Sequence, residues 1–243
     1  AASDVYKRQI EARLRLNLLR GDDKGWNWNV TLSASHERDK IRKLSNAMKA
    51  MNAEAMKIEN NTDSTSVFTM YEVGRSQKAL MLVKSLGIDP ATGNELYLKR
   101  DGSTTFDYDP NDRVEVGNTT PKIQGFINTN LSWNHIELYM AFNYEYGAKI
   151  YNSTLAQKVE GASPYQNADK RVLYGRWKKP GDIAMFRRID DQGPVYQSSR
   201  LVQKNNYIRM SSLSLTYDIP REKLARTFIE RCKFTFSMTD VFR

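Results

Sequence analysis

The sequence predicts an all-β fold: antiparallel strands of a transmembrane outer-membrane β-barrel, present as part of the barrel wall, with long extracellular loops. Three observations support this prediction. Several segments alternate apolar and polar residues over roughly 9 to 11 positions, the length of a strand that crosses an outer membrane. The links between these segments alternate between short and long. The longest uninterrupted apolar run is Ala79–Val83, which is far too short for a transmembrane helix.

The clearest alternation lies in the segment Asn205–Pro220. Tyr207 and Tyr217 stand near its two ends, where strands that span an outer membrane carry aromatic residues. Leu213 and Leu215 share a face with these tyrosines, so we expect both leucines to face lipid. Strands of soluble sheets are usually nearer to about 5 or 6 residues.

Two further segments, Ile123–Trp133 and Ile136–Tyr146, alternate in the same way. Only Asn134 and His135 separate them, which predicts a tight hairpin. Because side chains alternate along a strand, one face of the second segment is predicted to meet lipid and the other the lumen. The expected lipid-facing residues are Leu138 and Phe142, and the expected lumen-facing residues are Glu137, Asn143 and Glu145.

The ends of the chain repeat the pattern. Apolar residues at every second position of Ile10–Leu18 and Trp26–Ala34, joined by the turn Gly21–Gly25, predict another hairpin. Cys232–Phe242 alternates similarly and follows the link Asp218–Arg231. The polar row of each strand suits a water-filled or plugged lumen better than a dry core.

Strands around Val67–Gly74 and Lys78–Leu86, joined by Gly74–Ser76, would bring the number of wall strands to eight. The three long polar links are expected to be extracellular loops, because outer-membrane barrels have short periplasmic turns. Those loops are Glu37–Ser66, Gly87–Pro121 and Gly147–Lys204. Lys40–Met56, rich in Ala, Met, Lys and Glu, predicts a short helix within the first of them.

Composition sets outer limits on function. The chain has 243 residues, of which 40% are hydrophobic, and a net charge of +9. This charge admits nucleic acid or an anionic lipid surface as a partner. The basic residues are scattered, with only short clusters such as Lys40–Lys43 and Arg187–Arg188, and no recognition helix or basic stripe appears. Nucleic-acid binding is therefore not expected.

Catalysis and cofactors find no support in the sequence. A single cysteine, Cys232, excludes an intrachain disulfide, and His36 and His135 lie too far apart for metal-ligand spacing. No nucleophile motif, zinc-binding HExxH or phosphate-binding loop is present. We expect neither an enzyme nor a cofactor.

Five patterns occur in order between Trp26 and Phe242. They read WNWNVTLSASHERDKIRKL, GIDPATGNELY with the acidic stretch KRDGSTTFDYDPND, TPKIQGFINTNLSWNHIELYMAFNYEYGAKIYN, RWKKPGD and YIRMSSLSLTYDIP. Together they resemble the late barrel region of the SusC/RagA family of TonB-linked outer-membrane proteins of Bacteroidetes-type bacteria. Each pattern alone is a weak signal, whereas their collinear order is specific.

The resemblance implies a TonB-dependent importer of oligosaccharides or peptides in the cell outer membrane. Its implied partner is a SusD-like lipoprotein that closes over the extracellular loops. The TonB complex would act through a plug in an amino-terminal region that this chain lacks. Residues 10–243 are therefore expected to be a partial C-terminal barrel, a fragment of a longer receptor.

Two parts of the chain depart from the family. Members usually carry an Asn-Leu-Phe step near the end, where this chain has Asp240, Val241 and Phe242. Residues 1–9 do not resemble the family, and the stretch DVYKRQ matches an in-frame reading of a transposase adapter used in sequencing libraries. We interpret residues 1–9 as a non-native, adapter-derived segment.

Two groups of loop residues are candidates for ligand contacts. Carboxylates suit calcium, but Asp101, Asp107, Asp109 and Asp112 lack EF-hand spacing, so a solvated acidic loop is the favoured interpretation. In the longest loop, Tyr165, Tyr174 and Trp177 could stack on a sugar or fold back on their own loop. The resemblance places ligand and lid contacts in this loop, which also contains Asp182.

The alternative function is a soluble, secreted β-sandwich or adhesin-like binding module. Such a module predicts strands of about 5 or 6 residues and one dry inner face. A barrel instead predicts an outward apolar band roughly 25 Å tall. Strand length and exposed apolar surface therefore discriminate the two.

Overall fold

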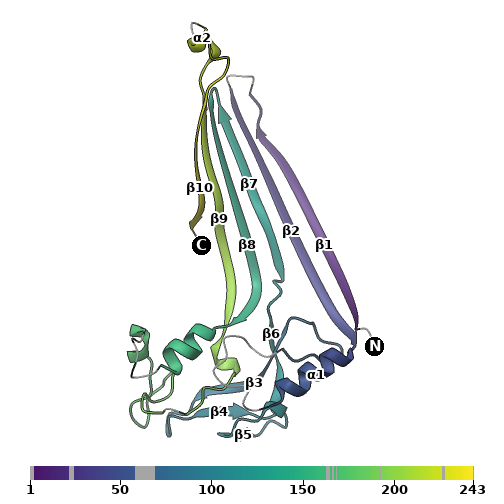
Figure 1. Ribbon diagram of the computed structural model, residues 1–243, viewed down its shortest axis with the longest axis vertical. Helices are drawn as coiled ribbons and strands as arrows, with labels where there is room; N and C mark the ends of the chain where they lie inside the picture. The colour runs from purple at the N-terminus through teal and green to yellow at the C-terminus, as the bar shows by residue number, and fades with distance from the viewer. Residues whose placement is uncertain are drawn as a thin grey trace. The chain divides into compact units, whose positions relative to one another are not determined.

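The computed structural model describes residues 3–21, 25–57, 69–162, 165, 167, 169–191, 193–225 and 228–242. Six long strands form one sheet in the order β1-β2-β7-β8-β9-β10 (Figure 1). Their bounds are β1 Asp4–Leu19, β2 Trp26–Lys43, β7 Ile123–Trp133, β8 Ile136–Tyr151, β9 Val202–Asp218 and β10 Lys233–Phe242. These strands have 10 to 18 residues, which favours the barrel prediction over the sandwich.

The chain divides into two compact units. We call residues 8–37, 121–147 and 205–243 the wall unit, and residues 1–7, 38–120 and 148–204 the loop unit. Among the described residues, no helix is long and apolar enough to cross a membrane.

The wall unit confirms the predicted hairpins. Within it, β2 pairs antiparallel with β7, and β7 pairs antiparallel with β8 from Ile123 opposite Tyr146 to Trp133 opposite Ile136. In the two-residue link, Asn134 has a φ of 53°. Asparagine adopts this left-handed conformation more readily than most residues, which suits the tight turn.

The C-terminal departure from the family is accommodated by a bulge. The β9–β10 register shifts between Thr239 and Phe242, and Asp240 within the shift has a φ of 54°. Asp and Asn both tolerate the left-handed region. The aspartate therefore fits the backbone at a position where the family usually has asparagine.

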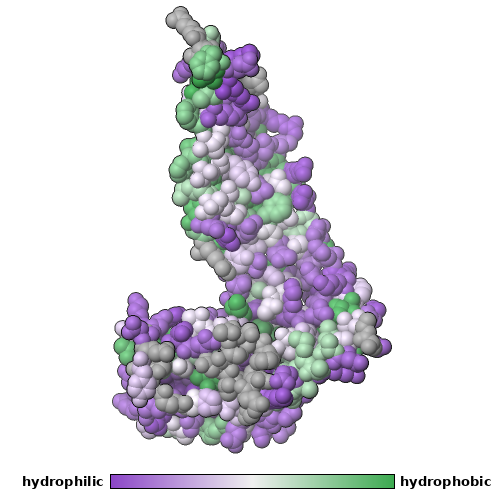
Figure 2. Space-filling model, in the orientation of Figure 1, coloured by the Kyte–Doolittle hydropathy of each residue, from purple (hydrophilic) through white to green (hydrophobic). Residues whose placement is uncertain are grey.

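Apolar side chains of the wall unit remain at the surface, as Figure 2 shows along its strands. Ile10 and Leu14 of β1 are 54% and 52% exposed, and Phe234 and Phe236 of β10 are 63% and 62% exposed. Monomeric soluble proteins rarely expose apolar surface on this scale. An apolar outer face is the property expected of a wall in contact with lipid.

The loop unit contains a second sheet in the order β5-β4-β3-β6. Its strands and helices are β3 Ala79–Ile88, β4 Glu95–Leu98, β5 Thr104–Thr105, β6 Arg113–Asn118, α1 Asn46–Ala55, and the short helices η2 Pro110–Asp112, η3 Leu155–Glu160, η4 Lys170–Leu173 and η5 Ser199–Leu201. In the wall unit, a short helix α2 (Arg221–Leu224) lies in the link between β9 and β10.

The prediction of eight wall strands was wrong. The segment predicted at Lys78–Leu86 does form a strand, β3, but in the sheet of the loop unit, where its residues 79–83 are all buried. Residues 69–74 form no strand, while residues 67–68 lie outside the described part of the chain. A strand buried on both faces reads as a continuous apolar run, and a wall strand alternates.

Other local predictions had mixed outcomes. A helix was predicted at Lys40–Met56, and α1 begins only at Asn46 because β2 continues to Lys43. Ser45 caps α1 by accepting a hydrogen bond from the Met48 N–H at 3.2 Å.

β1 begins at Asp4, within the segment interpreted as adapter-derived. The boundary at residue 10 stays a prediction.

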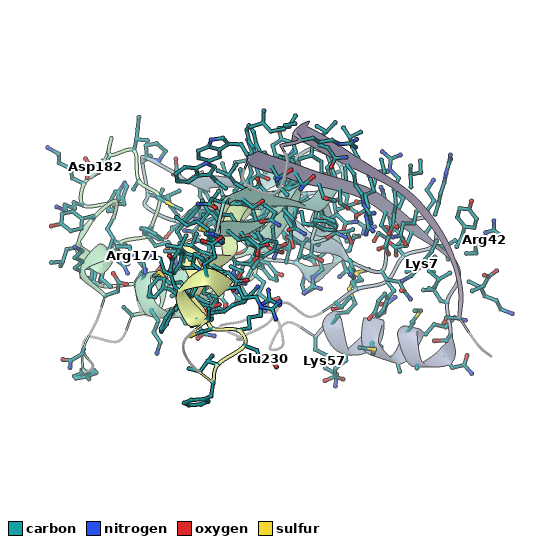
Figure 3. All side chains as sticks on the ribbon, turned by 90° about the horizontal axis from the view of Figure 1, so that it is seen from above. Lys7, Arg42, Lys57, Arg171, Asp182 and Glu230 are labelled. Carbon is teal, nitrogen blue, oxygen red and sulfur yellow. The ribbon has the colours of Figure 1, made fainter. Side chains whose placement is uncertain are left out.

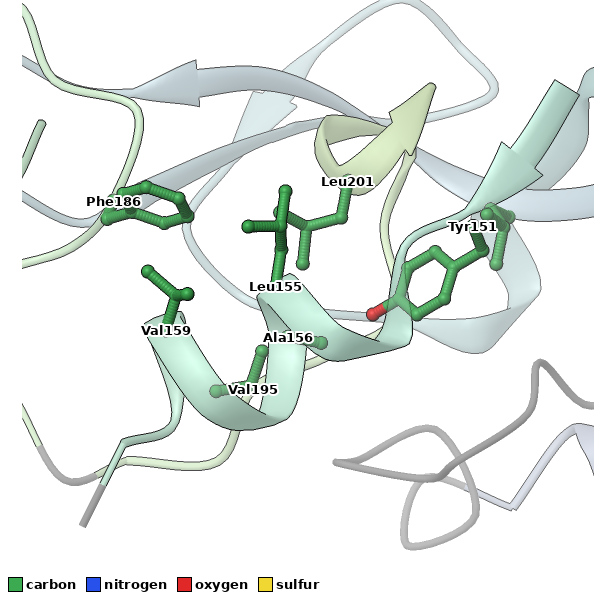
Figure 4. Packing of buried hydrophobic residues seen from close by; sticks show 8 residues of the cluster. Tyr151, Leu155, Ala156, Val159, Phe186, Val195 and Leu201 are labelled. Carbon is green, nitrogen blue, oxygen red and sulfur yellow. The ribbon is translucent and has the colours of Figure 1, made fainter. Parts of the chain in front are cut away.

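The hydrophobic core lies in the loop unit. Leu82 of β3, Leu155 and Val159 of η3 and Leu201 of η5 are buried together with Phe186 (Figure 4). A second cluster stacks the Tyr108 ring on Tyr196, with centroids 4.5 Å apart. The described parts of the long links, residues 87–120 and 148–204, therefore pack into one unit.

Candidate functional site

The loop unit is held together by a buried network of charged residues. The Arg200 guanidinium contacts the Glu95 and Glu160 carboxylates, each at 2.9 Å. Arg187 contacts the other oxygen of Glu160 at 3.0 Å. Glu95 and Glu160 are 5% and 4% exposed. The network therefore joins β4, η3 and η5 through charges that water does not screen.

The environment of Glu95 favours its ionised form. Burial acts to raise the pKa of Glu95, but the charge and hydrogen bonds of Arg200, with hydrogen bonds from Ser198 and Ser85, lower it below its ordinary value. The Ser198 hydroxyl donates to Glu95 at 2.5 Å. Burial likewise acts to lower the pKa of Arg200, and Glu95 and Glu160 raise it. Both groups are charged at neutral pH.

This pKa shift predicts a loss of stability in acid. A carboxyl group whose folded pKa is depressed stabilises the fold above its unfolded pKa, and the contribution disappears as the pH falls toward the folded pKa. We expect the loop unit to weaken as the pH falls below about 4.5, the ordinary value for Glu95. Hydrogen exchange of the β4 amides at a series of pH values measures this effect. A Glu95→Gln variant should be less stable at neutral pH, and its stability should change less with pH. If the change of stability with pH were the same as in the unaltered protein, Glu95 would not be the group responsible.

Arg176 fixes the segment that follows η4. Its guanidinium donates to the backbone carbonyls of Val172 at 2.7 Å, Arg187 at 3.1 Å and Glu160 at 3.1 Å, and also to that of Val159. Arginine has five donors in a rigid fork, so one side chain can satisfy several carbonyls. The segments 159–160, 172–176 and 187 are thereby held together.

Trp177 packs on the GIDPATG turn. Its indole N–H donates to the Pro90 carbonyl at 2.8 Å. Gly93 has a φ of +76°, and a Cβ placed there would lie 2.6 Å from the Trp177 ring. Asp89 accepts from the Thr92 N–H at 3.1 Å, a bond typical of a turn that an aspartate side chain caps. The ring therefore contacts its own protein rather than open solvent.

Asp182 has a local role in the same segment. One of its carboxylate oxygens accepts from the N–H groups of Lys178 and Lys179, at 3.1 and 3.0 Å. The Gly181 N–H donates to the Pro90 carbonyl at 2.8 Å, beside the bond from Trp177. Trp177 and Asp182 thus shape the surface on which other candidate residues are displayed.

The remaining candidates of this loop are exposed. Tyr165 is 94% and Tyr174 69% exposed. Sequence analysis did not single out two apolar neighbours, Leu173 at 66% and Ile183 at 95% exposure. Leu173, Tyr174 and Ile183 lie on the segment that Arg176 and Asp182 brace, and exposed apolar side chains placed in this way are suited to contact a ligand or a partner protein.

The four candidate calcium-binding carboxylates do not converge. Asp101 accepts from the Ser103 N–H and hydroxyl, at 2.8 and 2.7 Å, and these bonds lower its pKa. Asp109 caps η2, Asp112 accepts from the Arg100 N–H at 3.1 Å, and Asp107 is exposed. Among the residues that the structure describes, no group of three or more His, Cys, Asp or Glu side chains could hold a metal ion.

In the wall unit, the predicted polar and apolar rows find matching neighbours. Glu137 accepts from the Asn130 amide at 2.9 Å, and Asn143 is exposed. Glu145 departs from this pattern, because it accepts at 2.8 Å from the hydroxyl of Tyr207, which shares the predicted lipid-facing side with Leu213. The apolar partners in register are Leu138 with Leu131, Phe142 with Ile127, Leu213 with Met238 and Leu215 with Phe236. The assignment of these faces to lipid and lumen stays a prediction.

The comparisons with known proteins agree with this fold. No family model matches the sequence. The TonB-dependent receptor P3 of Formosa agariphila is 25% identical over 160 residues, which are 63% of this chain and 15% of that receptor.

Three solved structures also match. The RagAB peptide transporter and the RagAB peptide importer in the "open-open" state each superimpose with a TM-score of 0.77 at 19% identity, over 99% of this chain. The "closed-closed" state gives 0.75 over 98%. The chain covers 25% to 26% of the chains in these structures. The resemblance seen in the sequence is thus confirmed: this chain is similar to part of a SusC/RagA-type TonB-dependent receptor and shares the antiparallel barrel-wall fold.

Proposed function

We propose that this chain forms wall and loops of a TonB-dependent transporter in the cell outer membrane. The observation that carries the proposal is the wall unit, whose long antiparallel strands leave large apolar side chains such as Ile10, Leu14, Phe234 and Phe236 at the surface. A lipid environment accepts this surface and water disfavours it. In this proposal the chain is part of a longer receptor, since it covers only 15% of its curated relative.

We further propose that the cargo is an oligosaccharide or a peptide and that a SusD-like lipoprotein is the partner. The name of the RagAB peptide transporter supports the peptide class. The exposed side chains of Tyr165, Leu173, Tyr174 and Ile183 supply apolar and aromatic surface, which suits either a sugar face or a peptide side chain. The TonB complex would act on other parts of the receptor. The roles assigned to this chain include no catalytic step.

Uptake by cells that carry the full receptor tests the proposal. Labelled peptides and oligosaccharides should accumulate only when TonB is functional. Replacing both Leu173 and Tyr174 by alanine should reduce uptake of the preferred class several-fold, because the aromatic contact of Tyr174 contributes about 0.5 to 1.5 kcal/mol and the apolar contact of Leu173 adds to it. Uptake that persists without TonB would contradict the transport class.

A matched control separates ligand contact from damage to the loop. Lys178 and Lys179 lie in the same segment, and their side chains are exposed. The Lys178→Ala/Lys179→Ala variant should transport at the normal rate. Equal losses in both double variants would contradict the ligand role of Leu173 and Tyr174.

A further inference from the structure

Three cations occupy alternate positions near the end of β2. Arg38, Lys40 and Arg42 are all exposed, and we call them the cationic row. The intervening Ile41 is only 1% exposed. Its N–H donates to the Arg75 carbonyl and its carbonyl accepts from the Gly74 N–H, both at 2.8 Å.

The other intervening residue, Asp39, is also engaged with this segment. Its carboxylate accepts from the Ser76 hydroxyl at 2.5 Å and from the Gln77 N–H at 2.7 Å. Because side chains alternate along a strand, the cationic row points to the opposite face. Figure 3 shows Arg42 projecting outward from the ribbon, and its guanidinium lies 4.9 Å from the centre of the Tyr6 ring.

Among the residues that the structure describes, Arg38, Lys40 and Arg42 form no ion pair. Their acidic neighbours in the sequence, Glu37 and Asp39, lie at the alternate positions of β2 and so point to the other face, where Asp39 binds Ser76. Two residues of a strand span roughly 7 Å, so three positive charges follow one another at that spacing. Such a row attracts ligands that carry several negative charges.

The position of the row along β2 indicates which anion it meets. On the same alternating set of positions, β2 first carries the apolar residues Trp26, Trp28, Val30, Leu32 and Ala34. This apolar stretch is about 27 Å long at the usual rise, close to the height of the outward apolar band of a membrane barrel. The cations begin four positions after it, on the side of the long link. Membrane lipids place their phosphate groups directly beyond their hydrocarbon layer.

We propose that Arg38, Lys40 and Arg42 bind the phosphate groups of lipids in the leaflet at the long-loop end of the wall. The inference rests on the proposed membrane location of the chain. The backbone bonds of Ile41 to Gly74 and Arg75 fix the strand that presents all three cations. The row thereby anchors the wall against the lipid headgroups.

The test uses the full receptor, purified in a neutral detergent, and a diphosphorylated glycolipid as the probe. Native mass spectrometry counts bound lipid at increasing probe concentration. The Arg38→Gln/Lys40→Gln/Arg42→Gln variant should bind the probe roughly 100-fold more weakly, because each cation near an anionic lipid surface contributes to binding. The Lys49→Gln/Lys178→Gln/Lys179→Gln variant loses the same charge elsewhere in the loop unit and should bind normally.

Three outcomes would overturn the proposal. Equal affinity for the probe and for its dephosphorylated form excludes phosphate recognition. If inorganic phosphate displaces the glycolipid probe at equal concentration, the cationic row binds a soluble anion and not a lipid. An equal loss of probe affinity in both triple variants would show that binding depends on net charge alone and not on the position of the cationic row. Insertion of the receptor into neutral lipid vesicles is measured separately, and only its failure contradicts the proposed membrane location.

Discussion

Replacing Arg200 by methionine is expected to destabilise the loop unit by about 3 to 5 kcal/mol. The substitution keeps much of the side-chain volume but leaves Glu95 and Glu160, both almost fully buried, without their shared cation. Breaking one side of a buried ion pair costs more than the pair contributes, since the remaining charge stays desolvated. Hydrogen exchange of the β3 and β4 amides in the full receptor gives the local free energy of unfolding.

A surface ion pair supplies the control for this measurement. Arg188 pairs with Asp190, and both side chains are largely exposed at 47% and 61%. Because water screens this pair, Arg188→Met should leave exchange in β3 and β4 unchanged. If Arg200→Met behaves like Arg188→Met, the buried network does not stabilise the loop unit.

Replacing Phe142 by arginine is expected to lower the stability of the membrane-inserted receptor by about 2 to 4 kcal/mol. Phe142 lies near the middle of the predicted membrane span and pairs with Ile127 in register. A charge that faces lipid at this depth loses its hydration and gains no partner. The midpoint of denaturant unfolding in lipid bilayers reports the change.

The adjacent residue tests the direction of the side chain. Asn143 follows Phe142 on the same strand, so it points to the opposite face and is predicted to meet the lumen. Asn143→Arg should therefore cost much less than Phe142→Arg. The reverse order would show that the lipid and lumen faces were assigned to the wrong sides.

The sequence predicted the wall well because alternation and tight links are local signals. Trp26–Ala34 and Ile123–Trp133 carry their pattern within a few residues, and Asn134–His135 permits only a hairpin. The misassigned strand, β3, shows why length and hydrophobicity are not enough. Its continuous apolar run at residues 79–83 is typical of a strand buried on both faces, and this signal was present in the sequence.

The charged network could not be predicted in the same way. Glu95, Glu160 and Arg200 are separated by 40 to 105 positions, and each one alone looks like an ordinary surface residue. Only the folded loop unit brings them together. Arg176 lay within the recognised pattern RWKKPGD, but its role depends on carbonyls from three separate segments. The fold of the loop unit therefore depends on tertiary contacts, whereas local sequence patterns are enough to predict the strands of the wall.

The buried arginines have a consequence for how such a receptor can acquire a new cargo. Arg176 and Arg200 hold the loop unit together from inside, through backbone carbonyls and buried carboxylates. Tyr174 and Ile183 lie at the surface of the same unit. Under the proposed function, substitutions at these two positions are expected to alter the preference for cargo while the supporting fold keeps its stability. In the loop unit, the buried residues that stabilise the fold are thus different from the exposed residues that can be substituted.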